Sequence, residues 1–204
     1  MTMSWIETIP YAEATGRLQK LYDRVKGPDD NVDNIMMAHS LRPHSMEAHM
    51  GMYKKVLHHT SNSLPKWYLE AIGVYVSWLN ECHYCVQHHF EGLVTELGGV
   101  RSKADLIKSS FSEGDFQNAV STREAAGLKY AGLLTLHPSQ IQQSDVVALS
   151  EAGYDDGEIL EINQVTSYFN YANRTVLGLG VSTEGDVLGL APRNNDDPDD
   201  WNHG

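Results

Sequence analysis

Residues 66–97 read KWYLEAIGVYVSWLNECHYCVQHHFEGLVTEL, and this stretch decides the fold. Its first half, residues 66–79, follows Pro65 and is apolar almost all round, which is typical of a helix at the centre of a protein. Its second half, residues 81–97, follows Asn80 as a candidate N-cap and stops at Gly98-Gly99. Because only a short turn separates the two helices, we expect them to pack antiparallel as a central helical hairpin.

Helical periodicity also dominates the rest of the chain, and strand signals are scarce. Further helices are expected over residues 12–25, 43–59, 124–136, 145–153 and 158–179, with Ser121, Ser144 and Asp155 as caps and Gly178-Leu179-Gly180 as a helix end. The sequence therefore predicts an all-α fold. Residues 1–190 are expected to form one domain, and residues 191–204 an acidic tail or arm, flexible or docked, in which Trp201 is a candidate anchor.

Charge and composition exclude several classes of protein. The 204-residue chain has a net charge of −12 and a pI of about 5.1, which disfavours binding to nucleic acid or to anionic membranes. The N-terminus lacks a secretory signal, and no stretch approaches the roughly 20 apolar residues of a membrane span. We therefore expect a cytoplasmic protein. In that reducing compartment two cysteines indicate catalysis or metal binding rather than a structural disulfide.

The only two cysteines, Cys82 and Cys85, lie at the start of the second hairpin helix, and His89 follows one turn later. At 100° per residue these three side chains fall within an arc of about 60°, whereas His83 and His88 lie off that face. Cys82 is in the first turn, where the helix dipole lowers the pKa of a thiol. Cys85 has His89 at i+4, so the pair can serve as nucleophile and base.

A carboxylate on the first hairpin helix extends this group. Glu70 lies among apolar residues, nine positions before the helix ends at Leu79, or about 14 Å along the axis. His89 lies about 10 Å along the second helix from Cys82 on the same rule, so antiparallel packing brings Glu70 level with His89. Glu70, His89 and Cys85 can then form a proton relay in which a carboxylate orients a histidine that serves a thiol.

The spacing E-x11-C-x2-C-x3-H, carried by Glu70, Cys82, Cys85 and His89, resembles the alkylhydroperoxidase D-like branch of the carboxymuconolactone decarboxylase superfamily. Residues 5–23, WIETIPYAEATGRLQKLYD, and residues 130–174 resemble the subgroup of uncharacterised peroxidase-related enzymes in particular. The resemblance implies the helical alkylhydroperoxidase D-like fold, assembly into symmetric homo-oligomers (dimer, trimer or hexamer) and a thiol peroxidase without an organic cofactor.

The resemblance also implies a role for each site residue. Cys85 attacks a hydroperoxide and becomes a sulfenic acid, and Cys82 donates a proton and then closes a disulfide with Cys85. Glu70 and His89 carry the proton relay, and an external thiol or disulfide reductase recycles the protein. Tyr84 stands where some members have a histidine, which leaves the detailed proton route open. The dipole argument instead favours Cys82 as the more acidic thiol.

Two other functions remain open from the residues. One is a non-redox, decarboxylase-like lyase using Glu70 and His89, in which the two cysteines would have no evident task. The other is a metal-binding module in which Glu70, Cys82, Cys85 and His89 hold zinc. Three ligands from one helix would be unusual, and no second Cys/His pair has metal spacing. We therefore expect no metal, and the redox dithiol remains the leading hypothesis.

Several other polar and aromatic residues are interpreted as structural. Four histidines, His44, His49, His58 and His59, are expected at the surface. The aromatic run of Tyr168, Phe169 and Tyr171 is expected in the core or at a subunit interface. Three neighbours can line a pocket or lie exposed: Asn170, Asn173 and Arg174.

Overall fold

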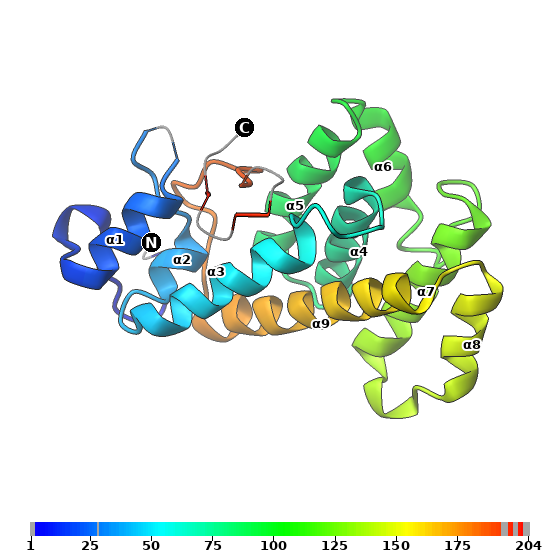
Figure 1. Ribbon diagram of the computed structural model, residues 1–204. Coiled ribbons are helices and arrows are strands. Elements are labelled where there is room, and N and C mark those ends of the chain that lie inside the picture. Colours follow the sequence, from blue (N-terminus) through cyan, green and yellow to red (C-terminus); the bar gives the residue numbers. More distant parts are fainter. Residues whose placement is uncertain (1–2, 28, 193–195, 198–199, 202–204) are drawn as a thin grey trace.

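The computed structural model describes residues 3–27, 29–192, 196–197 and 200–201 (Figure 1). These residues contain no β-strand, so the predicted all-α fold is confirmed. The helices are α1 (Gly16–Val25), α2 (Asn34–Ala38), α3 (Pro43–Leu57), α4 (Lys66–Leu79), α5 (His83–Glu96), α6 (Arg101–Ser109), α7 (Thr122–Leu136), α8 (Gln143–Glu151) and α9 (Asp156–Leu179), with short 3-10 turns η1 (Tyr11–Glu13) and η2 (Pro138–Gln140).

Helix α4 lies at the centre of the fold, as its apolar sequence predicts. Ten consecutive residues of α4, from Tyr68 to Ser77, are buried. The helix packs against α5 as the second arm of the hairpin and against α7 and the long helix α9. Figure 1 shows the long α9 running below α4 and α5 through the middle of the molecule, with α3 lying along it. The hairpin is therefore held between elements from distant parts of the chain.

Gly73 allows α9 to approach α4 closely. A Cβ atom built at Gly73 would lie 2.3 Å from ring atoms of Phe169, so the phenyl ring occupies the space where a side chain would be. The ring of Phe169 also packs edge-on against His89 of α5, with centroids 4.5 Å apart and an interplanar angle of 85°. A glycine inside a helix costs about 1 kcal/mol relative to alanine, and here the close packing accounts for it.

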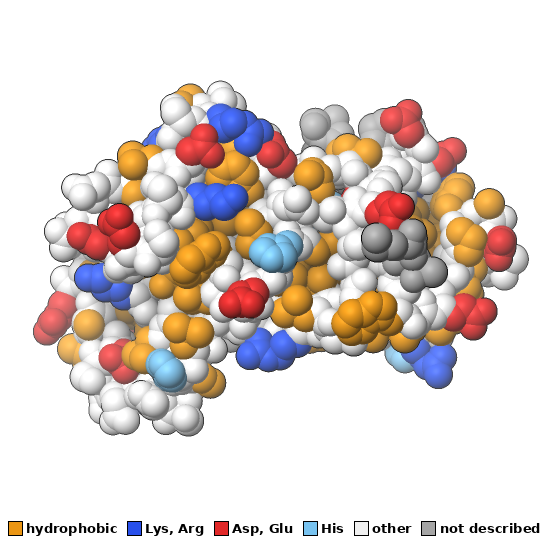
Figure 2. Space-filling view, turned by 180° about the vertical axis from the view of Figure 1, so that it is seen from behind, with side chains coloured by type: hydrophobic (Ala, Val, Ile, Leu, Met, Phe, Trp, Pro, Cys, Tyr) orange, Lys and Arg blue, Asp and Glu red, His pale blue; other side chains and the backbone are white. Residues whose placement is uncertain are grey.

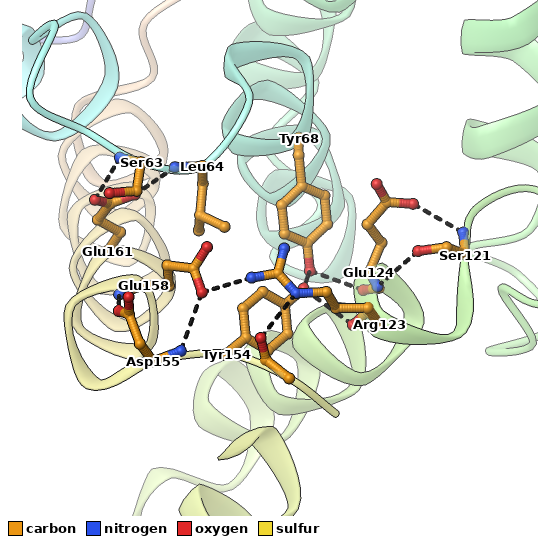
Figure 3. A network of polar contacts seen from close by, with 11 residues as sticks. Ser63, Leu64, Tyr68, Ser121, Arg123, Glu124, Tyr154, Asp155, Glu158 and Glu161 are labelled. Carbon is orange, nitrogen blue, oxygen red and sulfur yellow. Dashed lines mark hydrogen bonds and ion pairs between the residues drawn. The ribbon is translucent and has the colours of Figure 1, made fainter. Parts of the chain in front are cut away.

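A network of polar contacts joins α4, α7 and α9 at the end of the hairpin remote from the cysteines (Figure 3). The Arg123 guanidinium pairs with Glu158 at 2.5 Å and lies over the ring of Tyr154. The Tyr154 hydroxyl donates to that of Tyr68 at 3.0 Å. Glu161 accepts the backbone N–H groups of residues 63 and 64, just before α4 begins. The network therefore fixes the start of α4 against α9.

The predicted cap at Asn80 is wrong. Asn80 ends α4, and its side-chain amide donates to Asn173 at 2.9 Å and to Asn170 at 3.1 Å, both on α9. Glu81 adopts a left-handed conformation with φ of 56°, and Cys82 occupies the N-cap position of α5. The local capping preference of asparagine was overridden because its amide joins a long-range contact with α9.

Other helix ends agree only in part with the sequence. Ser121 and Asp155 cap their helices as predicted, each in a capping box, and Gly180 ends α9 with φ of 60°. The prediction of Ser144 as a cap is wrong, because Gln142 precedes the helix and donates its backbone N–H to Asp145 at 2.7 Å.

One helix start and two whole helices also differ from the sequence prediction. The opening helix starts at Gly16 rather than residue 12, with the turn η1 before it. Helices α2 and α6 were not predicted. Helix α2 has only five residues, whereas α6 shows a weak i, i+3 signal in its two buried residues, Ala104 and Ile107.

The chain after α9 returns to pack against the N-terminal helices and α5 (Figure 1). Trp201 is buried, and its ring lies 5.9 Å from that of Tyr53. Lys54 donates to the backbone carbonyls of Asp197 and Asp200. Trp201 therefore anchors the described part of the predicted arm. Residues 193–195, 198–199 and 202–204 of that arm lie outside the described residues, and the domain division at residue 190 stays a prediction.

The surface carries both signs of charge. Figure 2 shows acidic and basic side chains spread over one face of the molecule, without a basic patch on that face. Within the described part of the chain, no helix is long and apolar enough to cross a bilayer.

Replacing Gly73 by alanine is expected to destabilise the protein by about 1–3 kcal/mol, because the new methyl group must displace the Phe169 ring. Gly51 in α3 is the matched control, since a Cβ there meets nothing within 4 Å and alanine is the better helix former. Denaturant unfolding should show a loss of stability for Gly73→Ala and none for Gly51→Ala. Equal stability of the two variants would contradict this account of α4–α9 packing.

Candidate active site

The two cysteines lie together at the start of α5. The Cys82 and Cys85 sulfurs are 2.9 Å apart, and both are free thiols. Both are buried, Cys82 completely and Cys85 with 3% of its surface exposed. The left-handed turn at Glu81 and the backbone bond from the Cys82 N–H to the Ser77 carbonyl place Cys82 directly over the end of α4. The first turn of α5 then brings Cys85 onto the same face.

Glu70 and His89 meet across the hairpin. The Nδ1 atom of His89 lies 2.8 Å from Oε2 of Glu70, whose side chain is only 4% exposed. Because a carboxylate accepts the Nδ1 proton, Nε2 of His89 is left as the basic nitrogen. Gly92 makes room for this pair, since a Cβ there would lie 3.2 Å from the carboxyl carbon of Glu70. The structure therefore brings Glu70 level with His89, as the hairpin geometry predicts.

Helix α9 supports the dithiol from beneath. Asn173 is fully buried, donates to Ser77 at 3.0 Å and accepts from Asn80 at 2.9 Å. Asn173 also acts to lower the pKa of the Cys85 thiol, although Cys82 and burial outweigh this effect. Of the other two residues considered for a pocket, Asn170 takes part in the same network, and Arg174 is exposed and donates to Asn170. Asn173 thus ties the turn of the hairpin to α9.

The two thiols differ in acidity. A hydrogen bond from Cys85 lowers the pKa of Cys82 below its usual value, although burial opposes this effect. The same hydrogen bond, together with burial, raises the pKa of Cys85 well above its usual value. Cys82 is therefore the first of the pair to ionise, which agrees with the dipole argument from the sequence.

A cavity of about 60 Å³ opens on Cys85 but not on Cys82. At about 10–15 Å³ for each water, it has room for roughly four waters or for a small organic group. Its walls combine the hairpin, α3, α9 and the C-terminal segment. The side chains that line the cavity include Glu70, Cys85, His89, His49, Tyr168 and Trp201. A substrate in this cavity would meet Cys85 and His89 together.

A second carboxylate–histidine pair lies beside the cavity, and sequence reasoning missed it. Asp186 of the C-terminal segment accepts a hydrogen bond from Tyr84 at 2.8 Å and lies 3.1 Å from Nε2 of His88. It also accepts the backbone N–H of Asn34 at 3.0 Å, and its side chain is only 2% exposed. Burial and the Asp186 charge raise the pKa of Tyr84 well above its usual value.

His88 was predicted to lie off the face that carries the two cysteines and His89, and so away from the site. This is wrong, because His88 is buried and lines the same cavity. The helical wheel separated His88 from His89 correctly, but the C-terminal segment covers the side of α5 that the hairpin leaves open. His83, which was also predicted to lie off that face, is exposed. Tyr84, at the position where the sequence departs from its resemblance, faces Asp186.

Two of the histidines expected at the surface are buried. His49 stacks on His39, with ring centroids 4.9 Å apart, and His58 packs edge-on against Tyr53 at 4.9 Å. His49 lies on the same face of α3 as the buried Met46 and Met50. Its burial could therefore have been predicted from this spacing. His44 is exposed as predicted, and His59 is partly exposed.

The aromatic run on α9 divides between core and surface. Tyr168 and Phe169 are buried, whereas Tyr171 is 46% exposed. Among the described residues, no three His, Cys, Asp or Glu side chains are grouped so that they could hold a metal ion.

Thiolate absorbance near 240 nm should resolve two separate ionisations in the reduced protein, one below and one above the usual cysteine pKa of about 8.5. In a Cys85→Ala variant the remaining Cys82 loses its hydrogen-bond donor, so its ionisation should move to higher pH. Two thiols that titrate together near the ordinary value would contradict the assigned hydrogen bond.

Replacing Asp186 by asparagine should destabilise the protein by about 2–4 kcal/mol, because it removes the buried charge that serves Tyr84, His88 and Asn34. Glu113→Gln, at an exposed loop position, is the matched control and should change stability little. Denaturant unfolding of both variants tests this, and an Asp186→Asn protein as stable as the control would refute the anchoring role.

No protein-family model and no curated protein sequence matches the chain. Solved structures do match. The alkylhydroperoxidase AhpD core of an uncharacterized peroxidase-related protein from Ralstonia eutropha JMP134 is similar with a TM-score of 0.77 and 22% identity, covering 89% of this chain and 93% of that chain. An uncharacterized peroxidase-related protein from Silicibacter sp. TM1040 gives 0.75 and 22%, covering 89% and 92%.

A third similar structure is that of an enzyme with a different activity. The debrominase Bmp8, in a variant form bound to 2,3,4-tribromopyrrole, gives a TM-score of 0.65 at 15% identity, covering 91% of this chain and 92% of that chain. Proteins with this fold therefore carry more than one reaction. From the similarity to the two peroxidase-related proteins we conclude that the chain has the helical fold of the alkylhydroperoxidase AhpD core, as the resemblance in its sequence implied.

Proposed function

We propose that the protein is a thiol-dependent peroxidase that reduces hydroperoxides through Cys82 and Cys85. One observation carries the proposal. Two adjacent reduced thiols lie beside a cavity, and the thiol that lines it shares the wall with a histidine held by a buried carboxylate. On this basis we assign Cys85 as the nucleophile, His89 as the base and Glu70 as the group that orients the base.

The first step oxidises Cys85. Its proton passes to Nε2 of His89, and the thiolate attacks the terminal oxygen of R–O–O–H. The O–O bond breaks, an S–O bond forms, and Cys85 keeps the OH group as a sulfenic acid. The alkoxide takes the proton from His89 and leaves as an alcohol. Glu70 stabilises the transient positive charge on His89, with which it is hydrogen-bonded at 2.8 Å.

The second step uses the acidity of Cys82. Its lowered pKa favours the thiolate, which attacks the Cys85 sulfur from a starting distance of 2.9 Å. A disulfide forms, and the hydroxide expelled takes a proton to become water. The net reaction turns one hydroperoxide and two thiols into one alcohol, one water and one disulfide. The high acidity of Cys82 and the exposure of Cys85 to the cavity thus suit resolving and attacking roles respectively.

Turnover requires a thiol reductant that returns two electrons and two protons to the disulfide. A small thiol or a dithiol protein has the required chemistry. No organic cofactor enters any step of this cycle.

The test is hydroperoxide consumption by reduced protein, with cumene hydroperoxide as substrate and thiols counted. The wild type should lose two thiols for each hydroperoxide consumed, and Cys85→Ser should fall to the buffer rate. Glu70→Gln should slow consumption by about 100-fold, because the histidine loses the charge that supports it. Glu151→Gln on α8, an exposed carboxylate, is the matched control and should behave as wild type.

Bromide release from 2,3,4-tribromopyrrole should be measured beside peroxide consumption, because a protein of the same fold binds that compound. Hydroperoxide consumption that survives in Cys85→Ser would defeat the proposal, and bromide release without hydroperoxide consumption would assign the dithiol to another reaction.

A further inference from the structure

His49 of α3 lines the dithiol cavity and has a buried ring nitrogen that makes no hydrogen bond to the described residues. The side chain lines the cavity, and the residue is only 3% exposed. Its Nε2 atom lies 3.4 Å from the Tyr168 hydroxyl. Its Nδ1 atom is buried and has no hydrogen-bond partner among the residues that the structure describes. His49 has no role in the peroxidase steps proposed for Cys82, Cys85, His89 and Glu70.

The neighbours of His49 do not supply the missing partner. His39 stacks on its ring at 4.9 Å, but the Nδ1 atom of His39 is engaged with the Ile35 carbonyl at 2.8 Å. A buried polar atom left without a partner costs about 1–3 kcal/mol. Such atoms are rare in native proteins, and a bound ligand is one explanation for them. The position in a cavity beside Cys85 points to the substrate as that ligand.

The protonation of His49 makes Nδ1 a donor. Burial, together with His39 and His89, lowers the pKa of His49 to about 3, so the ring is neutral at physiological pH. Burial raises the pKa of Tyr168 well above its usual value, so its hydroxyl keeps its proton and can donate to Nε2. With Nε2 as acceptor, the remaining ring proton is on Nδ1. We assign this tautomer from the hydrogen-bond network.

We propose that His49 is a substrate-binding residue whose Nδ1–H donates a hydrogen bond to the carbon-bound oxygen of a neutral organic hydroperoxide held in the cavity. This inference rests on the proposed peroxidase function. As the O–O bond breaks, that oxygen keeps the bonding electron pair and becomes an alkoxide. The Nδ1–H group then stabilises the developing charge, as donors in an oxyanion hole do. His49 keeps its own proton, and the alkoxide is protonated by His89.

The cavity favours a neutral substrate of small size. No lysine or arginine is among the described residues that line it, whereas the carboxylates of Glu70 and Asp33 are. A carboxylate-bearing hydroperoxide would lose its hydration beside these charges without gaining a cation, which is costly. The small size of the cavity favours a compact molecule such as tert-butyl hydroperoxide over a long-chain hydroperoxide.

Two substitutions at His49 test the effect of the Nδ1–H donor separately from that of the ring's shape. His49→Phe keeps a buried aromatic ring against His39 and Tyr168 but removes both nitrogens. His49→Asn places an amide N–H near the position of Nδ1. We expect His49→Phe to lower kcat/KM for tert-butyl hydroperoxide by about tenfold or more, and His49→Asn to retain most of the wild-type value.

A second reaction of the same thiol distinguishes binding from structural damage. Alkylation of Cys85 by iodoacetamide releases iodide and forms no alkoxide, so its rate should be unchanged in His49→Phe. The proposal is overturned if both reactions slow in the same proportion, or if His49→Phe reduces tert-butyl hydroperoxide as fast as the wild type.

A binding measurement needs neither turnover nor a variant at His49. In Cys85→Ser protein labelled with ¹⁵N-histidine, tert-butyl alcohol should shift the His49 Nδ1 resonance saturably, and sodium acetate should not. No response to the alcohol would refute the binding role even if the protein is a peroxidase. A saturable response in a protein that consumes no hydroperoxide would defeat the proposed function alone.

Discussion

The buried hydrogen bond between Glu70 and His89 is the constraint on which the site depends. A carboxylate that is 4% exposed must have a partner, since an unpaired buried charge is very costly. The partner stands on the other arm of the hairpin, so the bond fixes the depth at which α4 and α5 pack. Two glycines serve the same arrangement. Gly92 gives the carboxylate its space, and Gly73 admits the Phe169 ring that packs on His89.

The C-terminal segment supplies part of the wall of the cavity that the hairpin lines. Asp186 holds His88 and Tyr84 on one side of the cavity, as Glu70 holds His89 on another. Trp201 lines the cavity and packs on the hydrophobic cluster to which α1, α2 and α3 contribute. The two adjacent histidines of α5 are thus each held by a buried carboxylate from a different element. Only one of them belongs to the relay proposed for the thiols.

Much of the fold was predictable because its signals are local. The apolar sequence of α4 placed it at the centre, and the spacing along the hairpin predicted two contacting pairs, Cys82 with Cys85 and Glu70 with His89. Two of the failures share one cause. Asn80 and His88 each have partners far away in the sequence, on α9 and in the C-terminal segment respectively. Helical phase shows which face a residue occupies but not what covers that face, and so Asp186 could not be found.

In the proposed reaction one hydroperoxide oxidises the two cysteines of one chain to a disulfide. A single-turnover experiment measures this step. Reduced protein receives one equivalent of tert-butyl hydroperoxide in the absence of any reductant, the alcohol is quantified, and peptide mass mapping locates the oxidised residues. One molecule of tert-butyl alcohol is expected for each Cys82–Cys85 disulfide formed. Alcohol formation no greater than in buffer, or oxidation confined to methionine with both thiols intact, would contradict it.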